Sequence, residues 1–394
     1  MSKPNRHVDL LVVGGGVLGA FHAWHAIGAN RSVLLLERNS APRGATVRNF
    51  GQIVPSGMNR AWQAWGRDSL AIYKSIQAQF DISLRQQGSI YLASDEEELG
   101  LLEELREINR ADDYPSQLLT RQQCSERYPA LRPDYCRGGL FFPQEVSVNP
   151  RLMIHRLHQF LAEQAGFEAR FDCCVCKLQE DDRGRVRAET GDGQSFVAER
   201  AIVCNGCEFR ILFPRLFRES GLEAVRLQML RLSPRPTVKL PGNILTGLTI
   251  RRYESFAECP SWASVKAREP ADSLWKQWGV HVLFKQEADG GIILGDSHQY
   301  LPAARIDQME FDLNTEINDC LVREGQKILE LPDWNIETSW SGMYCQTADP
   351  SGILTRTVGE RIHIVTGIGG KGMTGSAGFA KHHLEEILDD GGNP

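Results

Sequence analysis

Residues 8–19 read VDLLVVGGGVLG, and this stretch decides the fold of the first part of the chain. Its first half is typical of a short strand buried on both faces, and its second half matches the pattern G-x-G-x-x-G. Residues 20–29, AFHAWHAIGA, predict a helix after the glycines, and residues 32–36, SVLLL, predict a second buried strand. A strand, a glycine turn, a helix and a strand in this order predict a dinucleotide-binding unit.

Each glycine of this turn has a separate physical task. Gly14 permits the tight turn out of the strand, Gly16 lets the backbone approach a pyrophosphate, and Gly19 lets the helix pack close to the strand. The first N–H groups of the helix, at Val17 and Leu18, have no partner within the helix. They therefore face the phosphates with the positive end of the helix dipole.

Glu37, at the end of the second predicted strand, adds a signal for the ribose. An acidic residue about 20 positions after the first glycine accepts hydrogen bonds from the ribose hydroxyls, and it disfavours the 2′-phosphate of NADP. The alternative for the whole unit is a glycine turn that holds no ligand. The combination of features favours FAD or NAD.

The stretch from residue 37 to residue 57, ERNSAPRGATVRNFGQIVPSG, favours FAD over NAD. A nicotinamide dehydrogenase usually continues with further strand–helix units, whereas this stretch is a loop of small, basic and amide residues. Such a loop can pass under an isoalloxazine ring, and we expect Arg48 and Asn49 to contact the flavin or the substrate. The alternative for Arg48 is that it braces the loop through hydrogen bonds to carbonyl groups.

The C-terminal part repeats the theme of a strand, a glycine loop and a helix. Residues 361–366 predict the strand, residues 367–375, GIGGKGMTG, form the loop, and residues 376–390 predict the helix. The start of this helix, with Lys371 beside it, would stabilise the negative charge of a reduced flavin. Two such helix starts at opposite ends of the chain indicate one large cofactor held from both sides.

With these features in place, the chain resembles the D-amino acid oxidase, glycine oxidase and sarcosine oxidase superfamily over essentially its whole length. The marks are GGGVLG with Glu37, GATVRNFG at 44–51, Val148-Asn149-Pro150-Arg151 in place of the usual Asp-Pro, Val175 after Glu168, AIVCNG at 201–206, and the C-terminal loop. The resemblance implies FAD and an α/β fold. The Rossmann-like FAD-binding domain is joined to a discontinuous α+β substrate domain on a mixed, mostly antiparallel sheet.

The resemblance also implies a discontinuous division of the chain. The FAD-binding domain is expected at residues 1–85, 145–225 and 335–394, and the substrate-binding domain at residues 86–144 and 226–334. Four runs in the second set read as strands of its sheet: 88–93, 227–232, 280–285 and 291–295. A charged helix is expected between the first two of these runs, at residues 96–109.

The motifs and the resemblance together predict the residues that contact FAD. They are Gly14, Gly16, Val17, Leu18, Gly19, Glu37, Arg38, Ala45, Thr46, Asn49, Gly51, Val175, Asn205, Gly206, Gly342, Gly369, Gly370, Gly372, Met373 and Thr374.

Residues 340–349, WSGMYCQTAD, depart from the pattern of the superfamily. Members that resemble glycine oxidase place an Arg at the position of Tyr344, where it holds the substrate carboxylate. Monomeric sarcosine oxidases have Cys-Met-Tyr here, and that Cys holds the flavin covalently. This chain has Gly342-Met343-Tyr344 and Cys345 is a poor substitute, so we expect non-covalent FAD. Tyr344 is expected to reach the site, and its alternative is a core tyrosine with one hydrogen bond.

We expect few side chains to take part in the chemistry, because the cofactor supplies most of it. The candidates are Tyr344, Lys371, Arg48 and His298. His298 lies near the position of an active-site His in sarcosine oxidases, and its alternative is a hydrogen-bonded surface residue. Because the carboxylate-binding Arg is missing, another cation must hold an acidic substrate: Arg48, Arg251, Arg252, Lys285 or Lys371. We interpret Arg251 and Arg252 as a solvated surface pair.

Within the superfamily, the RNFG loop, the VNP motif and the missing Arg resemble a branch associated with bacterial organophosphonate degradation. This resemblance implies oxidation of a small anionic amine, by hydride transfer to flavin N5 and hydrolysis of the imine to an aldehyde and an amine. The implied substrate is an N-alkylated aminoalkylphosphonate such as N-methyl-2-aminoethylphosphonate, and O₂ or another acceptor reoxidises the flavin. The alternatives are a sarcosine, glycine or D-amino acid oxidase, an FAD-dependent 2-hydroxy acid dehydrogenase, and a flavoprotein subunit or redox sensor.

The composition argues against several other classes of protein. Of 394 residues, 44 are Lys or Arg and 50 are Asp or Glu, and a net charge of −6 disfavours nucleic-acid binding. No apolar run reaches the roughly 18 residues of a membrane helix, and the N-terminus does not resemble a signal peptide. We therefore expect a cytoplasmic monomer or homo-oligomer. The cysteines show no zinc spacing, so we expect no metal.

Overall fold

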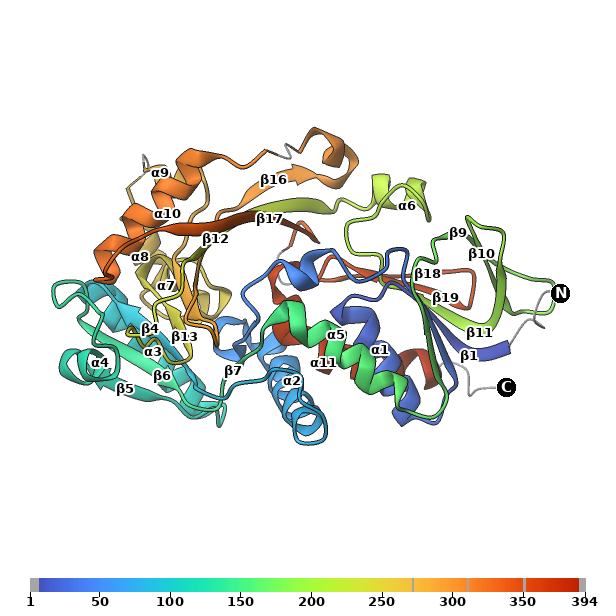
Figure 1. Cartoon of the computed structure of the whole chain (residues 1–394), viewed down its shortest axis with the longest axis horizontal. Coiled ribbons are helices and arrows are strands. Elements are labelled where there is room, and N and C mark those ends of the chain that lie inside the picture. The colour runs from blue at the N-terminus through green and yellow to red at the C-terminus, as the bar shows by residue number, and fades with distance from the viewer. Residues whose placement is uncertain (1–6, 271–272, 310–311, 350–351, 390–394) are drawn as a thin grey trace.

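Residues 7–270, 273–309, 312–349 and 352–389 are described by the computed structural model, and they form one sheet of eight strands, one of nine and a two-stranded ladder. The ladder pairs β3 (Gln52–Ile53) with β7 (Val146–Ser147). Figure 1 shows the eight-stranded sheet on the right and the nine-stranded sheet on the left. The prediction of an α/β fold with a second, mixed sheet is confirmed.

The eight-stranded sheet is built around the first predicted strand. Its strands, from one edge, are β18 (Leu354–Val358), β19 (Ile362–Thr366), β11 (Ser195–Val203), β1 (His7–Val13), β2 (Val33–Leu36) and β8 (Phe167–Arg170), and β10 (Val186–Thr190) joins β11 to β9 (Val175–Glu180). β1 is parallel to both β2 and β11. All four residues of β2 are buried, which agrees with an apolar run covered on both faces.

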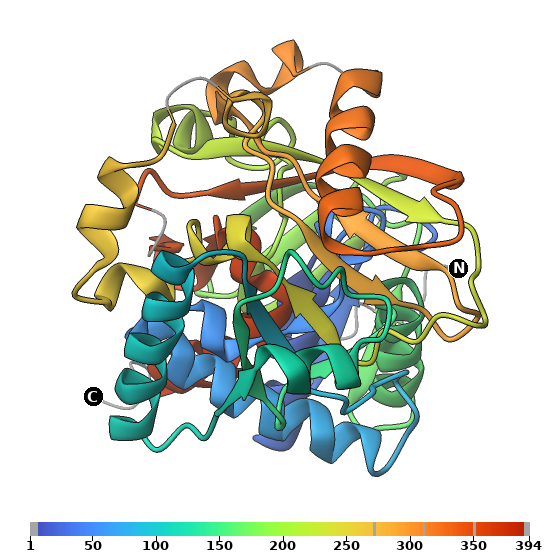
Figure 2. The same cartoon turned by 90° about the vertical axis from the view of Figure 1, so that its left-hand side faces the viewer.

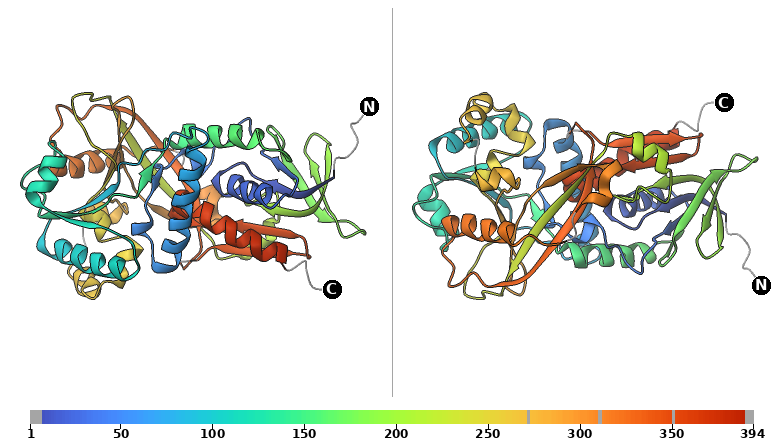
Figure 3. Two further views of the ribbon diagram at one scale, coloured as in Figure 1. Left: turned by 90° about the horizontal axis from the view of Figure 1, so that it is seen from below. Right: turned by 90° about the horizontal axis from the view of Figure 1, so that it is seen from above.

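Four long helices pack beside this sheet and beside one another. They are α1 (Val17–Gly28), α2 (Arg60–Gln77), α5 (Pro150–Ala162) and α11 (Gly372–Asp389). Figure 3 shows α11 next to α1 and α2, so the two ends of the chain meet here. In α5 the side chain of Asn149 accepts from the N–H groups of Arg151 and Leu152, and Pro150 occupies the first turn. Asn149 therefore supplies the helix cap that the Asp of the usual Asp-Pro would supply.

Two helices begin earlier than the sequence predicted. α1 begins at Val17 rather than residue 20, and α11 begins at Gly372 rather than residue 376. In both cases glycines that we assigned to the loop already have helical geometry. The helix N-termini therefore lie inside the glycine motifs.

The nine-stranded sheet is mostly antiparallel. Its strands are β16 (Gln299–Pro302), β12 (Glu223–Leu232), β15 (Ile292–Gly295), β14 (Leu283–Gln286), β13 (Asn243–Leu245), β4 (Ser89–Ala93), β6 (Gly138–Phe142) and β5 (Gln117–Thr120), with β17 (Ile336–Gln346) paired to β12. β14 and β15 form the predicted hairpin. The long pair β12 and β17 runs from the left half of Figure 1 toward the first sheet, and this carries residues of β17 to the cavity described below.

The remaining helices lie around the second sheet or in the connections. They are α3 (Glu96–Ala111), α4 (Arg121–Arg127), α6 (Pro214–Glu219), α7 (Gly247–Ile250), α8 (Trp262–Ala267), α9 (Leu274–Gln277) and α10 (Thr315–Ile328). α3, teal in Figure 2, packs on β4, β5 and β6, and α10, orange there, packs on β12 and β15. α3 is capped by Asp95, and three glutamates fill its first turn, where they complement the helix dipole.

The division into two domains stays a prediction, and its outer limits at residues 1 and 394 lie outside the described residues. None of the helices in the described ranges has the length and apolar character needed to cross a membrane.

Candidate active site

A cavity of about 1160 Å³ extends from the glycine turn of the first sheet to the nine-stranded sheet. Ligand pockets commonly measure about 300–1,000 Å³. This cavity therefore has room for a dinucleotide and a small second molecule. Its walls come from both ends of the chain and from the segment between residues 248 and 300.

The glycine turn lies at one end of the cavity and admits no side chain. Gly14 has a φ of +109°, and a Cβ atom there would lie 2.3 Å from the carbonyl oxygen of Cys204. A Cβ atom on Gly19 would lie 2.1 Å from the carbonyl oxygen of Gly14. The close helix–strand contact predicted for Gly19 is therefore present, although Gly19 itself is not part of the cavity wall.

Glu37 and Thr46 support the start of α1. The buried Glu37 carboxylate accepts a hydrogen bond from the N–H of Gly15 at 2.8 Å and from the N–H of Asn39 at 3.0 Å. The Thr46 hydroxyl accepts from the N–H of Val17 at 3.0 Å. A carboxylate has about four acceptor sites, so Glu37 retains capacity for ribose hydroxyls.

Polar atoms left without partners indicate that this end of the cavity is shaped for a polar ligand. The Oδ1 atom of Asn205 and the Nε2 atom of Gln52 are buried and have no hydrogen-bond partner. Both residues line the cavity. Buried polar groups are normally paired, so these two atoms, together with a turn that a Cβ atom would fill, fit a bound dinucleotide.

The structure brings nearly all the predicted site residues to this one cavity. The predicted residues that line it are Gly14, Gly16, Val17, Leu18, Glu37, Arg38, Ala45, Thr46, Arg48, Asn49, Gly51, Val175, Asn205, Gly206, His298, Gly342, Tyr344, Gly369, Gly370, Lys371, Gly372, Met373 and Thr374. Which of them contact FAD stays a prediction.

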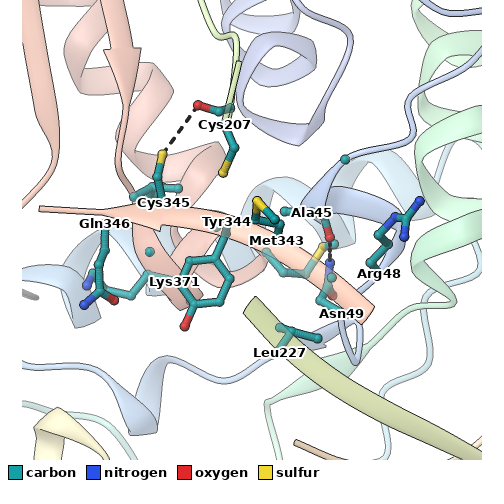
Figure 4. A pocket seen from close by; sticks show the side chains of 18 of the residues that line it. Ala45, Arg48, Asn49, Cys207, Leu227, Met343, Tyr344, Cys345, Gln346 and Lys371 are labelled. Carbon is teal, nitrogen blue, oxygen red and sulfur yellow. Dashed lines mark hydrogen bonds between the residues drawn. The ribbon is translucent and has the colours of Figure 1, made fainter. Parts of the chain in front are cut away.

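Arg48 and Asn49 both brace the loop that carries them. Arg48 donates to the carbonyl oxygens of Arg43 at 2.9 Å and Ser341 at 2.8 Å. The Asn49 amide donates to two loop carbonyls and accepts from the N–H of Gly51. The bracing alternative therefore describes Arg48 in this structure, and Figure 4 shows its guanidinium turned away from Tyr344.

Lys371 and Tyr344 lie where the C-terminal glycine loop meets β17 (Figure 4). The Lys371 ammonium forms an ion pair with Glu254 at 3.3 Å and lies 5.2 Å from the ring centroid of Trp62. Burial lowers the pKa of Lys371, and Glu254 opposes this effect. A Cβ atom on Gly370 would lie 3.7 Å from the Tyr344 hydroxyl, so Tyr344 faces the loop. Burial also raises the pKa of Tyr344 well above its usual value.

The five candidate cations differ in their partners. Lys285 is buried and pairs with Glu287 at 2.8 Å, and it is not part of the cavity wall. Arg251 binds Asp95 and Glu98, both at 2.7 Å. The interpretation of Arg251 as one of a solvated surface pair is therefore wrong, because its side chain is only 13% exposed within an acidic cluster.

Arg252 differs from its neighbour Arg251 in what it meets. It lines the cavity, and its guanidinium donates to the Tyr300 hydroxyl at 2.6 Å. Among the residues that the structure describes, none with a carboxylate forms an ion pair with Arg252. Arg252 is therefore exposed but positioned at the cavity, with a neutral partner only.

Sequence analysis did not single out two further residues in this region. His281 and Asp296 line the cavity beside His298, and all three are buried. Their one sequence signal is position, since His281 precedes β14 and Asp296 follows β15. His298 is therefore not the surface residue that was its alternative.

A family model described as "FAD dependent oxidoreductase" (DAO) matches residues 9–385. The chain belongs to this family. The protein is therefore an enzyme, an FAD-dependent oxidoreductase, and FAD is its cofactor.

Three relatives illustrate the similarity. The chain is 25% identical to an opine oxidase subunit of Rhizobium meliloti over 358 residues, which cover 87% of this chain and 83% of that protein. It is 26% identical to N-methyl-L-tryptophan oxidase of Escherichia coli over 215 residues, covering 53% of this chain and 56% of that one. The fold matches glycine oxidase from Geobacillus kaustophilus with a TM-score of 0.75 at 18% identity, covering 98% and 95% of the two chains.

Proposed function

We propose that the enzyme oxidises the C–N bond of a small amine that carries an anionic group, with an N-alkylated aminoalkylphosphonate as the substrate. The observation that carries this proposal is Arg252. It brings a cation without a carboxylate partner to the cavity, while Tyr344 stands where glycine-oxidase-like members place their carboxylate-binding Arg. The names of the relatives, which include glycine, N-methyl-L-tryptophan and opine oxidases, support amine chemistry.

The charge of the substrate decides between a phosphonate and a carboxylate. A phosphonate dianion binds best to two or more cationic or N–H partners. Lys276 lines the same cavity as Arg252, and its ammonium has only the carbonyl oxygen of Pro270, at 3.5 Å, as a hydrogen-bond partner in the described ranges. Two cations with neutral partners favour the more highly charged anion.

The residues of the chain hold and orient the reactants. FAD, when bound, accepts the hydride from the carbon beside the nitrogen, and O₂ or another acceptor removes the electrons afterwards. Tyr344 and the glycine loop at 369–372 form one wall of the substrate end, and Lys371 is held there by Glu254. We propose that FAD is bound non-covalently, because Gly342 occupies the position of the linking Cys.

The products of turnover test this proposal. N-Methyl-2-aminoethylphosphonate should be consumed and should yield either formaldehyde with 2-aminoethylphosphonate or methylamine with the phosphonoaldehyde, depending on which carbon is oxidised. Aldehyde trapping and phosphorus NMR distinguish the two pairs. Absence of both pairs, with turnover of a carboxylate amine instead, would overturn the phosphonate assignment.

A secondary amine with carboxylates is the second candidate. It is favoured by the match to the opine oxidase of Rhizobium meliloti, which covers most of both chains. Arg252 would then bind a carboxylate. Turnover of sarcosine, glycine, a D-amino acid or an opine, and none of the phosphonate, would establish this candidate.

A further inference from the structure

A cluster of three buried titratable side chains, His281, Asp296 and His298, lies at the substrate end of the cavity. Their exposed fractions are 4%, 7% and 8%. The hairpin of β14 and β15 brings them together, because His281 precedes its first strand and the other two follow its second. Their potential ligand atoms all lie within 4.8 Å of one another.

The hydrogen bonds of His298 define its tautomer. Its Nδ1 atom lies 3.1 Å from the carbonyl oxygen of Gly279, which can only accept, so Nδ1 carries the proton. In the neutral ring Nε2 then has a free lone pair. Within the described part of the chain, no hydrogen bond to Nε2 is formed, and the residue lines the cavity. A neutral imidazole held in this way is able to accept a proton from a ligand.

Asp296 provides the charge that such a base needs. Its Oδ1 atom lies 3.9 Å from Nδ1 of His298 and 2.7 Å from Nε2 of His281. The contact with His281 is outside hydrogen-bond geometry, so this buried oxygen has no satisfactory donor. Burial alone would raise the pKa of Asp296, but the two histidines lower it below its usual value. A buried carboxylate at this position stabilises an imidazolium.

We propose that His298 removes the proton from the substrate's ammonium group, and that Asp296 is the positioning residue that stabilises the resulting imidazolium. This inference rests on the proposed amine chemistry. Alkylamines are protonated at neutral pH, and a nitrogen that carries the proton has no lone pair to assist loss of hydride from the adjacent carbon. The N–H bond breaks, its electron pair stays on nitrogen, and the proton moves to Nε2 of His298 and later to solvent.

Arg252 links the anion of the substrate to this step. It hydrogen-bonds to Tyr300, whose ring stacks on His298 at a centroid distance of 6.3 Å and an angle of 21°. Burial first, and then the charge of Arg252, lower the pKa of His298 to about 3. An anionic group bound to Arg252 offsets this charge, so the base becomes stronger when the correct substrate is present. The titratable or charged groups that face His298 are Asp296, His281, Arg252, Tyr300 and Tyr344.

A metal ion in the cluster is a poorer explanation. The Nδ1 atoms of His281 and His298 are already bonded to Thr249 and Gly279. Arg252 adds a positive charge nearby. Prolonged dialysis of the wild-type protein against EDTA should therefore leave the rate unchanged. A loss that Zn²⁺ restores would overturn the proton-transfer role.

The rate of flavin reduction after anaerobic mixing, measured against pH, tests the proposal. His298→Gln should be slower than wild type by about 100-fold or more at pH 7, in line with general base catalysis. The gap should narrow to under about 10-fold above about pH 10, where the amine loses its proton in solution. Asp296→Asn should show the same pattern with a smaller loss.

The matched control is His382→Gln, because His382 also pairs with an aspartate, Asp68 at 3.1 Å, but outside the cavity wall. It should match wild type at every pH. An equal loss for His298→Gln at pH 7 and pH 10 would indicate a purely structural role and would overturn the proposal. If wild type itself is reduced by no amine, the proposed function fails instead. Should His298→Gln lose FAD, Asp296→Asn carries the same test.

Discussion

At the scale of single residues, the specificity of the site depends on Arg252. Its guanidinium has a neutral partner, Tyr300, and lines the cavity. A charge-assisted hydrogen bond contributes about 1.5–3 kcal/mol. We therefore expect Arg252→Met to raise KM for an anionic amine by about 10- to 100-fold, with kcat much less affected.

Steady-state kinetics with Arg215→Met as the control measures this effect, since Arg215 forms an exposed ion pair with Glu219 away from the cavity. Arg252→Lys should recover part of the affinity. An unchanged KM for Arg252→Met would show that another cation holds the anion.

Sequence alone could predict the contacts of the glycine motifs but not those of Arg252. The motifs are local, because backbone geometry at Gly14 and Gly16 depends on neighbouring residues. Arg251 and Arg252 follow the last turn of α7, where consecutive side chains point about 100° apart. One meets the acids around α3 and the other meets the cavity, and only the tertiary structure decides which.

At the scale of elements, the turn between β1 and α1 should be intolerant of any side chain. Gly14→Ala places a Cβ atom 2.3 Å from the Cys204 carbonyl oxygen at a φ of +109°. We expect the purified variant to lose its FAD, measured by the ratio of flavin to protein absorbance. Gly28→Ala, at the end of α1 with nothing within 4 Å of the added Cβ atom, should retain it. Full FAD content in Gly14→Ala would contradict the assigned turn.

The predicted elements were mostly found, and their differences from the structure have a local cause. The strands of the first sheet and the hairpin of β14 and β15 follow from apolar patterns and turn residues. The starts of α1 and α11 were predicted too late, because glycine disfavours helices in general, whereas these glycines are placed in a helix by contacts from other elements. Thr46, for example, caps α1 from a distant loop.

At the scale of the whole molecule, a buried acid should affect stability. Glu145 is fully buried against Tyr114 and Ser56, and burial raises its pKa from 4.5 to about 7. Because the folded-state pKa is the higher one, its contribution is fully present below about pH 4.5 and is lost as the pH rises to about 7. The loss amounts to about 3 kcal/mol.

Glu145→Gln should therefore flatten the decline in the free energy of unfolding over this range, measured by urea denaturation at several pH values. Glu103→Gln, on an exposed part of α3, is the control and should follow wild type. An identical decline in Glu145→Gln and wild type would contradict the expected titration.

The two sheets and the cavity that extends between them could be expected only in part. The superfamily resemblance anticipated both sheets, and the domain boundaries stay a prediction. The cluster of His281, Asp296 and His298 depends on the hairpin of β14 and β15 facing the first sheet, a long-range arrangement that no local pattern encodes.

The central claim is tested most directly by anaerobic bleaching of the flavin with single substrates. The panel holds N-methyl-2-aminoethylphosphonate, 2-aminoethylphosphonate, sarcosine, glycine, a D-amino acid and a 2-hydroxy acid. We predict rapid loss of the yellow flavin absorbance with the N-methylated aminophosphonate and slow or no loss with the others. Rapid bleaching by sarcosine or by the hydroxy acid, with none by either aminophosphonate, would contradict the proposed function.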